Sequence, residues 1–238
     1  MMNKKKKILV FTATYNEKEN IQKLILGIKN SLPSSSILII DDNSPDGTAE
    51  IIKKLQTKIN NLILISRNQK SGLDSAHKLA YDYSIKNQFD YLITMDADLS
   101  HDPSVLPVFV ENLNNNPFVL GSRYIPGGKC LMKGSRLIMS FVGNKLIKVI
   151  SRIKSNEYTT SYRGFNINEL RNFHLNQIKY KGYSFFMGTI FELYKKQFFI
   201  KEIPIIFADR STGVSKIPKF EIFRTLKNLF IYSIKNFF

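Results

Sequence analysis

YLITMDADLSHDP, residues 91–103, is an apolar run that ends in two aspartates two positions apart, Asp96 and Asp98. In a strand, side chains at i and i+2 point to the same side, so both carboxylates can share one cation at the strand's end. Mg²⁺ and Mn²⁺ take carboxylate oxygen and keep sites for substrate phosphate, and Ser100 can add an oxygen nearby. The alternative is that the aspartates cap a helix starting near Pro103, and His101 is expected to be a polar loop residue.

Outward from this stretch, short apolar runs alternate with helical patterns. Strands are expected at 8–13, 37–40, 62–65, 91–95 and 118–121, and helices at 19–31, 48–55, 72–85 and 104–113. This alternation predicts an α/β fold with a mostly parallel central sheet and helices on both faces. Ligands of such sheets bind at the carboxyl ends of strands, where segments 15–17, 41–46 and 96–100 fall.

The second half of the chain has a different pattern. A long basic helix is expected at 131–153, a strand at 200–207 and an aromatic-rich helix at 220–238. No internal repeat or long linker is evident. We therefore expect one domain over residues 1–218, followed by a basic aromatic-rich helix over 219–238.

Composition narrows the class of protein. The single cysteine, Cys130, excludes an internal disulfide and a cysteine-based zinc site. The chain has 35 Lys and Arg residues against 19 Asp and Glu, a formal charge of +16. This charge favours nucleic acid, anionic lipid or phosphate-bearing substrates as partners, although a lysine-rich compositional bias would also explain it. No nucleic-acid-reading motif supports a nucleic-acid partner. The apolar run at 8–11 is too short for a signal peptide, and no stretch approaches the ~20 residues of a spanning helix.

Other polar residues fit a nucleotide-binding site. Tyr15 can offer a flat face to a nucleobase, Glu17 can bond base or ribose, and Asp41 can accept hydrogen bonds from a base. Arg123 can reach a diphosphate oxygen. Arg210 and Lys216, in a Gly/Ser-containing loop, suit closure over a diphosphate leaving group. For Arg210 or Lys216 taken alone, a solvated surface cation is the favoured interpretation, and the alternative for Arg123 is an exposed loop cation.

Six segments in order, 13–21, 37–48, 93–103, 121–124, 135–144 and 202–217, together resemble the family 2 glycosyltransferases. Within that family they are most similar to the dolichyl-phosphate (polyprenyl-phosphate) mannosyltransferases. The resemblance implies a GT-A fold, the Rossmann-like fold of nucleotide-diphospho-sugar transferases, with Mg²⁺ or Mn²⁺. It also implies an inverting transfer of a sugar, usually mannose from GDP-mannose, to a polyprenyl monophosphate.

The resemblance also assigns roles to residues. Those expected to hold the nucleotide sugar are Ala13, Tyr15, Glu17, Ile39, Asp41, Asp96, Ala97, Asp98, Ser100, Arg123, Arg210 and Lys216. The metal is expected at Asp96, Asp98 and Ser100, the acceptor phosphate at Ser135 and Arg136, and the catalytic functions at Asp98, Arg123, Arg210 and Lys216. No catalytic base is required, because a phosphate monoester is already largely ionised near neutral pH.

Three departures from the family pattern concern the sugar and acceptor half of the site. Ala13 stands where a proline is usual, and TTSYRGF at 159–165 replaces T-S-G-F-R or T-G-S-F-R. Gly188 stands where relatives often carry a glutamate, for which Glu192 is a candidate substitute. The alternatives left open are a UDP-sugar such as UDP-glucose, a different acceptor, or a non-catalytic nucleotide-sugar-binding or membrane scaffold protein, although a scaffold would not need the metal pair.

A polyprenyl acceptor implies a membrane surface. The helices at 131–153 and 220–238 both interleave apolar with basic residues, a pattern that binds anionic interfaces. For the first helix, membrane docking and ordinary core packing remain equally open. For the second, its terminal position and aromatic density favour a membrane or a small membrane subunit. The expected location is cytoplasmic, peripheral on the cytosolic face of a membrane.

Overall fold

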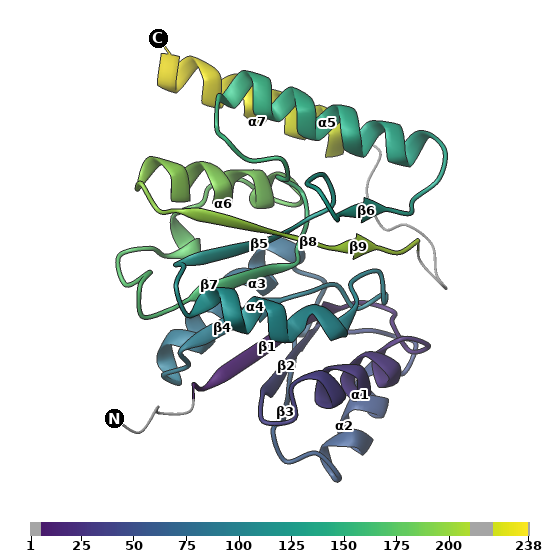
Figure 1. Ribbon diagram of the computed structural model, residues 1–238. Helices are drawn as coiled ribbons and strands as arrows, with labels where there is room; N and C mark the ends of the chain where they lie inside the picture. The colour runs from purple at the N-terminus through teal and green to yellow at the C-terminus, as the bar shows by residue number, and fades with distance from the viewer. Residues whose placement is uncertain (1–5, 210–220, 238) are drawn as a thin grey trace.

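The computed structural model describes residues 6–209 and 221–237 and is built on a seven-stranded sheet (Figure 1). The strands run in the order β3 (Leu62–Ser66), β2 (Ser36–Asp41), β1 (Ile8–Thr14), β4 (Tyr91–Thr94), β7 (Arg163–Asn166), β5 (Phe118–Ser122) and β8 (Ile200–Pro204). All neighbours pair in parallel except β7, which is antiparallel to both β4 and β5. The predicted mostly parallel central sheet is confirmed.

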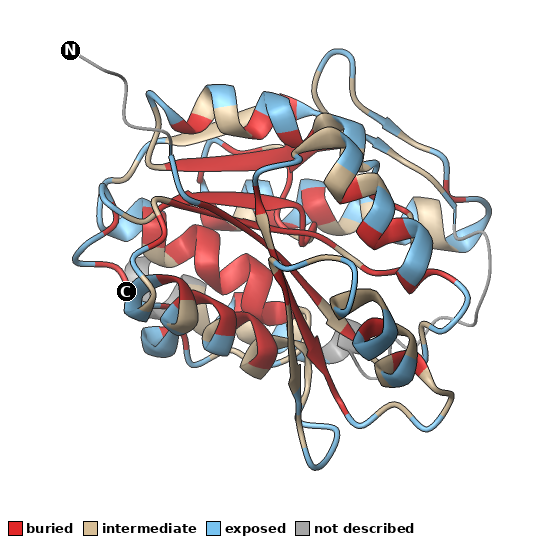
Figure 2. Ribbon diagram, turned by 90° about the horizontal axis from the view of Figure 1, so that it is seen from below, coloured by how far each residue is buried: buried red, intermediate tan, exposed pale blue. Residues whose placement is uncertain are grey.

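Helices cover both faces of the sheet, as the alternation of strands and helices predicts. Alternate residues of the strands enter two separate hydrophobic clusters, because successive side chains of a strand point to opposite faces. One cluster includes residues of α1 (Ile21–Ser31), α2 (Thr48–Gln56) and α4 (Leu106–Leu113), and the other includes residues of α3 (Leu73–Lys86) and α6 (Ser184–Lys195). The central strands are almost wholly buried (Figure 2).

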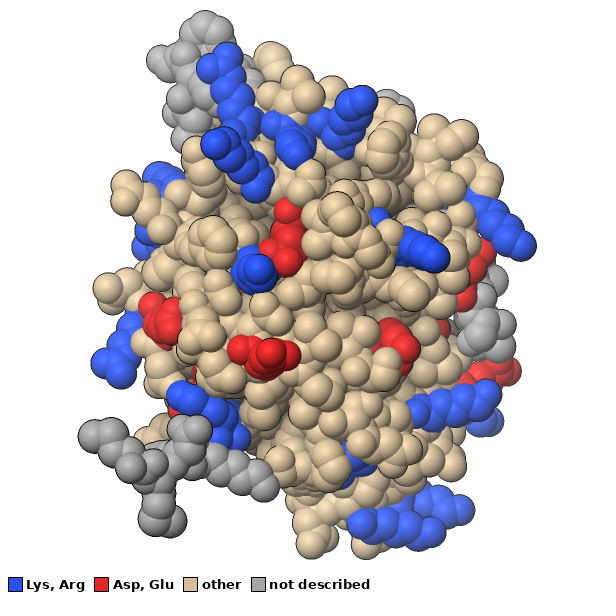
Figure 3. Space-filling model, in the orientation of Figure 1, with Lys and Arg blue, Asp and Glu red and all other residues tan. Residues whose placement is uncertain are grey.

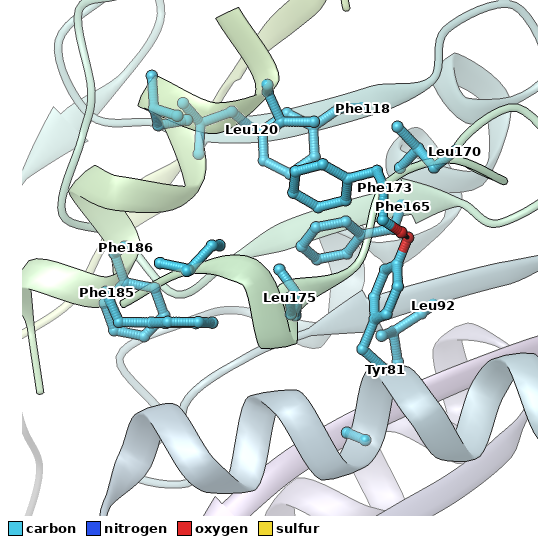
Figure 4. Close-up of a cluster of buried hydrophobic side chains, with 14 of the residues drawn as sticks. Tyr81, Leu92, Phe118, Leu120, Phe165, Leu170, Phe173, Leu175, Phe185 and Phe186 are labelled. Atoms are coloured by element: carbon cyan, nitrogen blue, oxygen red, sulfur yellow. Dashed lines mark hydrogen bonds between the residues drawn. The ribbon is translucent and has the colours of Figure 1, made fainter. Parts of the chain in front are cut away.

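β7 is a strand of the central sheet that the sequence pattern does not predict. It is anchored by aromatic packing, in which Tyr81 of α3 meets the rings of Phe165 and Phe173 at 5.5 and 6.1 Å (Figure 4). A Cβ at Gly164 would lie 2.9 Å from Leu113, so this glycine allows α4 to pack closely on the strand. A short strand that begins with a buried arginine and a glycine lacks the apolar alternation by which strands are recognised.

The antiparallel direction of β7 has a consequence for the site. Arg163, its first residue, pairs with Thr94 near the end of β4 and with Leu120 near the end of β5. The loop that precedes β7 therefore emerges at the same edge of the sheet as the carboxyl ends of the parallel strands.

Two expectations for the second half are corrected, and one helix is found in addition. The strand expected at 200–207 is two strands: β8 extends the central sheet, whereas β9 (Ile206–Phe207) pairs with β6 (Lys129–Cys130) in a separate two-stranded sheet. The helix expected from residue 131 begins only at α5 (Ser135–Ser151), because the chain turns at Gly134, which has φ of +62°. Helix α6 was not expected at all.

The C-terminal helix, α7 (Glu221–Phe237), lies beside α5 at one end of the molecule (Figure 1). Leu229 of α7 is buried, and Tyr232 stacks on Phe191 of α6 with ring centroids 3.8 Å apart. The predicted helix is thus confirmed, while the division of the chain at residue 218 stays a prediction. Among the described residues, no helix combines the length and apolar character needed to cross a membrane.

Candidate active site

The two aspartates follow β4 at the carboxyl edge of the sheet. Asp98 is buried, and its Oδ1 accepts hydrogen bonds from the backbone N–H of Ser100 at 3.1 Å and from the Ser100 hydroxyl at 2.5 Å. Leu99 between them has φ of +63°, which closes this tight turn. The side chain of Asp96 is 34% exposed, so the pair presents one fixed and one accessible carboxylate.

His101 supports this turn from inside. Expected as a polar loop residue, it is instead fully buried, and burial lowers its pKa. Its Nδ1 accepts the backbone N–H of Asp96 at 3.0 Å, which places the proton of the neutral ring on Nε2, 3.3 Å from the Thr160 hydroxyl. His101 therefore links the aspartate turn to the loop that precedes β7.

Ser161 lies in that same loop and contacts the accessible carboxylate. Its hydroxyl donates a hydrogen bond to Asp96 Oδ1, and its carbonyl accepts one from the Thr94 hydroxyl. The loop is thereby fastened to β4 and to the turn that follows it.

The predicted nucleotide-binding residues gather beyond β1 and β2. Asp41 is buried at the end of β2, where its carboxylate accepts the Thr14 hydroxyl at 2.7 Å, the Ser44 hydroxyl at 2.6 Å and the Ser44 N–H at 2.8 Å. A carboxylate has about four acceptor positions, so Asp41 is held in place with capacity for one further donor. Lys70 Nζ lies 4.1 Å from the centroid of the Tyr15 ring. Glu17 accepts a hydrogen bond from the Asn20 side chain at 2.9 Å.

The structure does not present every predicted side chain at this edge. Ile39 lies within β2 with its side chain in the hydrophobic core. Ala97 lies at the edge between the two aspartates, but its side chain is buried in the same core. Ala13 is half-buried near the end of β1. Arg210 and Lys216 fall outside the described residues.

Arg123 follows β5 and is buried rather than a solvated loop cation. Its Nε and Nη2 each donate to the carboxylate of Glu157 at 2.7 Å, and Nη2 also donates to the Thr159 hydroxyl at 2.8 Å. Burial alone would raise the pKa of Glu157, but the charge and hydrogen bonds of Arg123 outweigh it and hold that pKa below its usual value. Sequence reasoning missed Glu157, because only the unexpected antiparallel strand β7 brings it to this edge.

A cavity of about 460 Å³ opens between α5, α7 and the carboxyl edge of the sheet. Its walls are largely apolar and include Met132, Met139, Val142, Leu146, Phe186 and Leu226. Asp96, Arg123, Arg136 and Ser161 provide polar groups in the same lining. The cavity thus joins an apolar space to the accessible carboxylate of Asp96.

Of the two predicted acceptor-phosphate residues at the start of α5, Arg136 is among the described residues that line the cavity and Ser135 is not. The Nη1 atom of Arg136 lies 3.4 Å from Asp209 Oδ1. Ser135 is exposed.

Packing leaves room only for a glycine at position 188. It is buried in α6, and a Cβ there would lie 2.2 Å from the ring of Tyr180. No side chain fits without movement of that ring. Glu192, one turn further along α6, is not among the described residues that line the cavity, so the structure gives no support for its acting as a substitute.

Solved structures define the class of fold. Glucosyl-3-phosphoglycerate synthase from Mycobacterium tuberculosis, in complex with Mn²⁺, UDP and phosphoglyceric acid, superposes with a TM-score of 0.66 at 14% identity over 97% of this chain and 78% of that chain. A mannosyltransferase from Pyrobaculum calidifontis, in complex with GDP-Man and Mn²⁺, gives 0.58 at 15% identity over 95% of this chain and 69% of that chain. The chain has the GT-A fold.

The sequence comparisons give the family. The model described as Glycosyl transferase family 2 matches residues 9–198, so the chain belongs to this family and is a glycosyltransferase. It is 31% identical over 212 residues to the undecaprenyl-phosphate mannosyltransferase of Micrococcus luteus, covering 89% of this chain and 87% of that protein. It is 30% identical to the polyprenol monophosphomannose synthase of Mycolicibacterium smegmatis, covering 88% and 80%.

Proposed function

We propose that the protein transfers mannose from GDP-mannose to a polyprenyl monophosphate with inversion at the sugar. The observation that carries this proposal is the apolar cavity between α5 and α7, whose lining includes Asp96 and Arg123. An apolar space that meets a charged site suits an acceptor with a hydrocarbon tail and an anionic head. The names of the two mannosyltransferase relatives point to the same acceptor class and sugar.

The metal site fits a hard divalent cation. Asp96, Asp98 and Ser100 offer the oxygen ligands that Mg²⁺ and Mn²⁺ prefer, on a turn already fixed by its own hydrogen bonds. These residues would hold the ion, which when bound supplies charge neutralisation for the departing diphosphate.

The chain's own residues orient the two substrates. Tyr15, Glu17 and Asp41 would bind the nucleotide at the ends of β1 and β2, with Ala13 and Ala97 nearby, and Arg210 and Lys216 would contact the diphosphate. Arg123 and Arg136, which line the cavity, would attract phosphate oxygens, and the apolar walls would exclude water that could hydrolyse the donor. An acceptor phosphate oxygen then bonds to the anomeric carbon as the bond from that carbon to the diphosphate oxygen breaks.

We also propose that α5 and α7 rest on the membrane that holds the acceptor, on its cytosolic face. Ile138, Phe141 and Val149 of α5 are exposed, as is Phe230 of α7, although exposed helices normally show polar residues. Lys and Arg side chains gather at the end of the molecule formed by these helices (Figure 3). An apolar strip flanked by cations fits an anionic lipid surface.

The function is tested by incubating the purified protein with radiolabelled GDP-mannose, Mn²⁺ or Mg²⁺ and a short polyprenyl phosphate. Label that enters the organic phase only with metal, and is lost in Asp98→Asn, is the expected result. Transfer from UDP-glucose but not from GDP-mannose would overturn the proposal that GDP-mannose is the donor. Absence of transfer from either donor by the folded protein would overturn the proposed reaction.

A further inference from the structure

Glu157 is a fully buried carboxylate to which no part of the proposed reaction assigns a task. Its Oε2 accepts Nε of Arg123, and its Oε1 accepts Nη2 of the same guanidinium, both at 2.7 Å. Oε1 also accepts the backbone N–H groups of Tyr158, Thr159 and Thr160 at 3.1, 2.9 and 3.2 Å and the Thr159 hydroxyl at 3.0 Å. One carboxylate therefore organises both a loop and a buried cation.

The loop itself is held at its other end. Arg163, at the start of β7, donates to the carbonyls of Thr160 and Tyr158 at 2.7 and 3.0 Å. Glu157 is thus fixed in position by the fold and cannot follow Arg123 if the guanidinium moves. A fixed carboxylate paired side-on with a planar guanidinium sets both the position and the plane of that group.

The Nη1 side of the Arg123 guanidinium does not contact Glu157. Nε and Nη2 are engaged by Glu157 and Thr159, whereas Nη1 has no hydrogen-bond acceptor within residues 6–209 and 221–237. The guanidinium carbon lies 5.1 Å from the ring centroids of both Tyr124 and Phe207, so the group is also flanked by aromatic faces. Because Arg123 lines the cavity, the remaining N–H groups are available to an anion there.

The pairing explains why an arginine can be buried at this place. A buried cation without a partner carries a large desolvation cost, which a hydrogen-bonded carboxylate offsets. Without Glu157, Arg123 would be expected to turn toward solvent or toward Asp96, the nearby carboxylate of the cavity lining. Either movement would remove a fixed donor from the polar end of the cavity.

We propose that Glu157 is a positioning residue that holds Arg123 with its Nη1 edge toward a substrate phosphate oxygen. This inference rests on the proposed function and extends it by naming Glu157 as the residue that fixes the contact between Arg123 and the phosphate. The phosphate belongs either to the acceptor or to the donor diphosphate, and the test separates the two.

The variants are Glu157→Gln, Arg123→Ala and the double variant. The control is Glu202→Gln, because Glu202 accepts the backbone N–H of Asn156, the residue next to Glu157, and does not contact Arg123. Binding of farnesyl phosphate, farnesol and GDP is measured by calorimetry in detergent, and the KM values for both substrates are measured alongside. Glu157→Asp, which keeps the charge and shortens the side chain, replaces Glu157→Gln if that variant does not fold.

In Glu157→Gln we expect binding of one phosphate ligand to weaken about tenfold or more, with farnesol binding unchanged. Loss confined to farnesyl phosphate assigns the contact to the acceptor, and loss confined to GDP assigns it to the donor. The double variant should be no worse than Arg123→Ala, because Glu157 acts through Arg123. Unchanged binding of both ligands, or additive losses in the double variant, would overturn the proposal.

These binding measurements do not depend on turnover. A wild-type protein that binds farnesyl phosphate more tightly than farnesol, loses that preference in Glu157→Gln and yet transfers no sugar would retain the positioning role and reject the proposed reaction. A wild-type protein with no phosphate preference and no GDP binding would reject the positioning role itself.

Discussion

The hydroxyl of Ser161 donates a hydrogen bond to Oδ1 of Asp96, although the two residues are 65 positions apart in the chain. Asp96 is the more exposed member of the aspartate pair, so this contact restrains the carboxylate that is least held by its own turn. Hydrogen bonds to a metal ligand orient it and tune its affinity for the ion.

With Asp96 as a proposed metal ligand, replacing Ser161 by Ala should weaken metal use. We expect the Mn²⁺ concentration for half-maximal transfer to rise about tenfold, in the range typical of lost outer-shell contacts. The thermal midpoint without metal should change little, because only one hydrogen bond is removed. Ser84→Ala, which removes a buried serine of α3 far from the aspartates, serves as the control. An unchanged Mn²⁺ requirement would show that Ser161 does not support the metal site.

Much of the fold could be predicted because its parallel strands are short apolar runs bounded by polar turns. The aspartate pair was predictable for the same reason, since it directly follows one such run at β4. β7 could not be predicted, because Gly164 is placed there by the packing of α4 and Arg163 by a hydrogen bond to the backbone carbonyl of Phe186 in α6. Glu157 and Ser161 were missed with it, because their partners depend on the direction of that strand.

Gly188 illustrates the opposite case, in which a departure is visible in the sequence but its cause is not. Only the contact with Tyr180 shows that this position has no room for a side chain. The glutamate expected at this position from the family resemblance could not be accommodated without moving an aromatic ring that packs near Phe191.

Gly188→Ala should consequently destabilise the protein. A methyl group forced against a packed ring typically costs about 1–3 kcal/mol, which denaturant unfolding can measure. Combining it with Tyr180→Ala should recover part of the Gly188→Ala loss, so that the two effects are not additive. Full additivity would mean that the ring of Tyr180 is not the obstacle.

Membrane docking can be tested by point substitutions on the exposed face. Leu229 of α7 is buried, so deletion of that helix would expose core residues and confuse stability with binding. Ile138→Ser combined with Val149→Ser removes two exposed side chains, 63% and 67% accessible, and should lower co-sedimentation with anionic vesicles at least tenfold.

The matched control for this test is Leu79→Ser, which removes an exposed apolar side chain from α3. It should leave vesicle binding unchanged. The thermal midpoint of the double variant should also stay near that of the wild type. Equal losses in the control and the double variant would argue against a specific docking face.

His77 should make the protein acid-sensitive. It is buried beside the rings of Phe11 and Phe186, each 5.0 Å away, and burial followed by the charge of Arg163 lowers its pKa from 6.5 to about 3. Between these two pH values the unfolded chain binds a proton at this position and the folded chain does not. Stability is therefore lost as the pH falls below 6.5.

At pH ~5 the protonation of His77 in the unfolded chain lowers the free energy of unfolding by about 2 kcal/mol relative to neutral pH. His77→Leu removes the titrating group while keeping an apolar side chain against the same rings. Denaturant unfolding is measured at neutral and acid pH for both proteins. The free energy of unfolding should fall less on acidification in the variant than in the wild type, by about these 2 kcal/mol. Any decrease that remains in the variant comes from other groups, such as buried His101. Equal decreases in both proteins would mean that His77 is protonated within the fold.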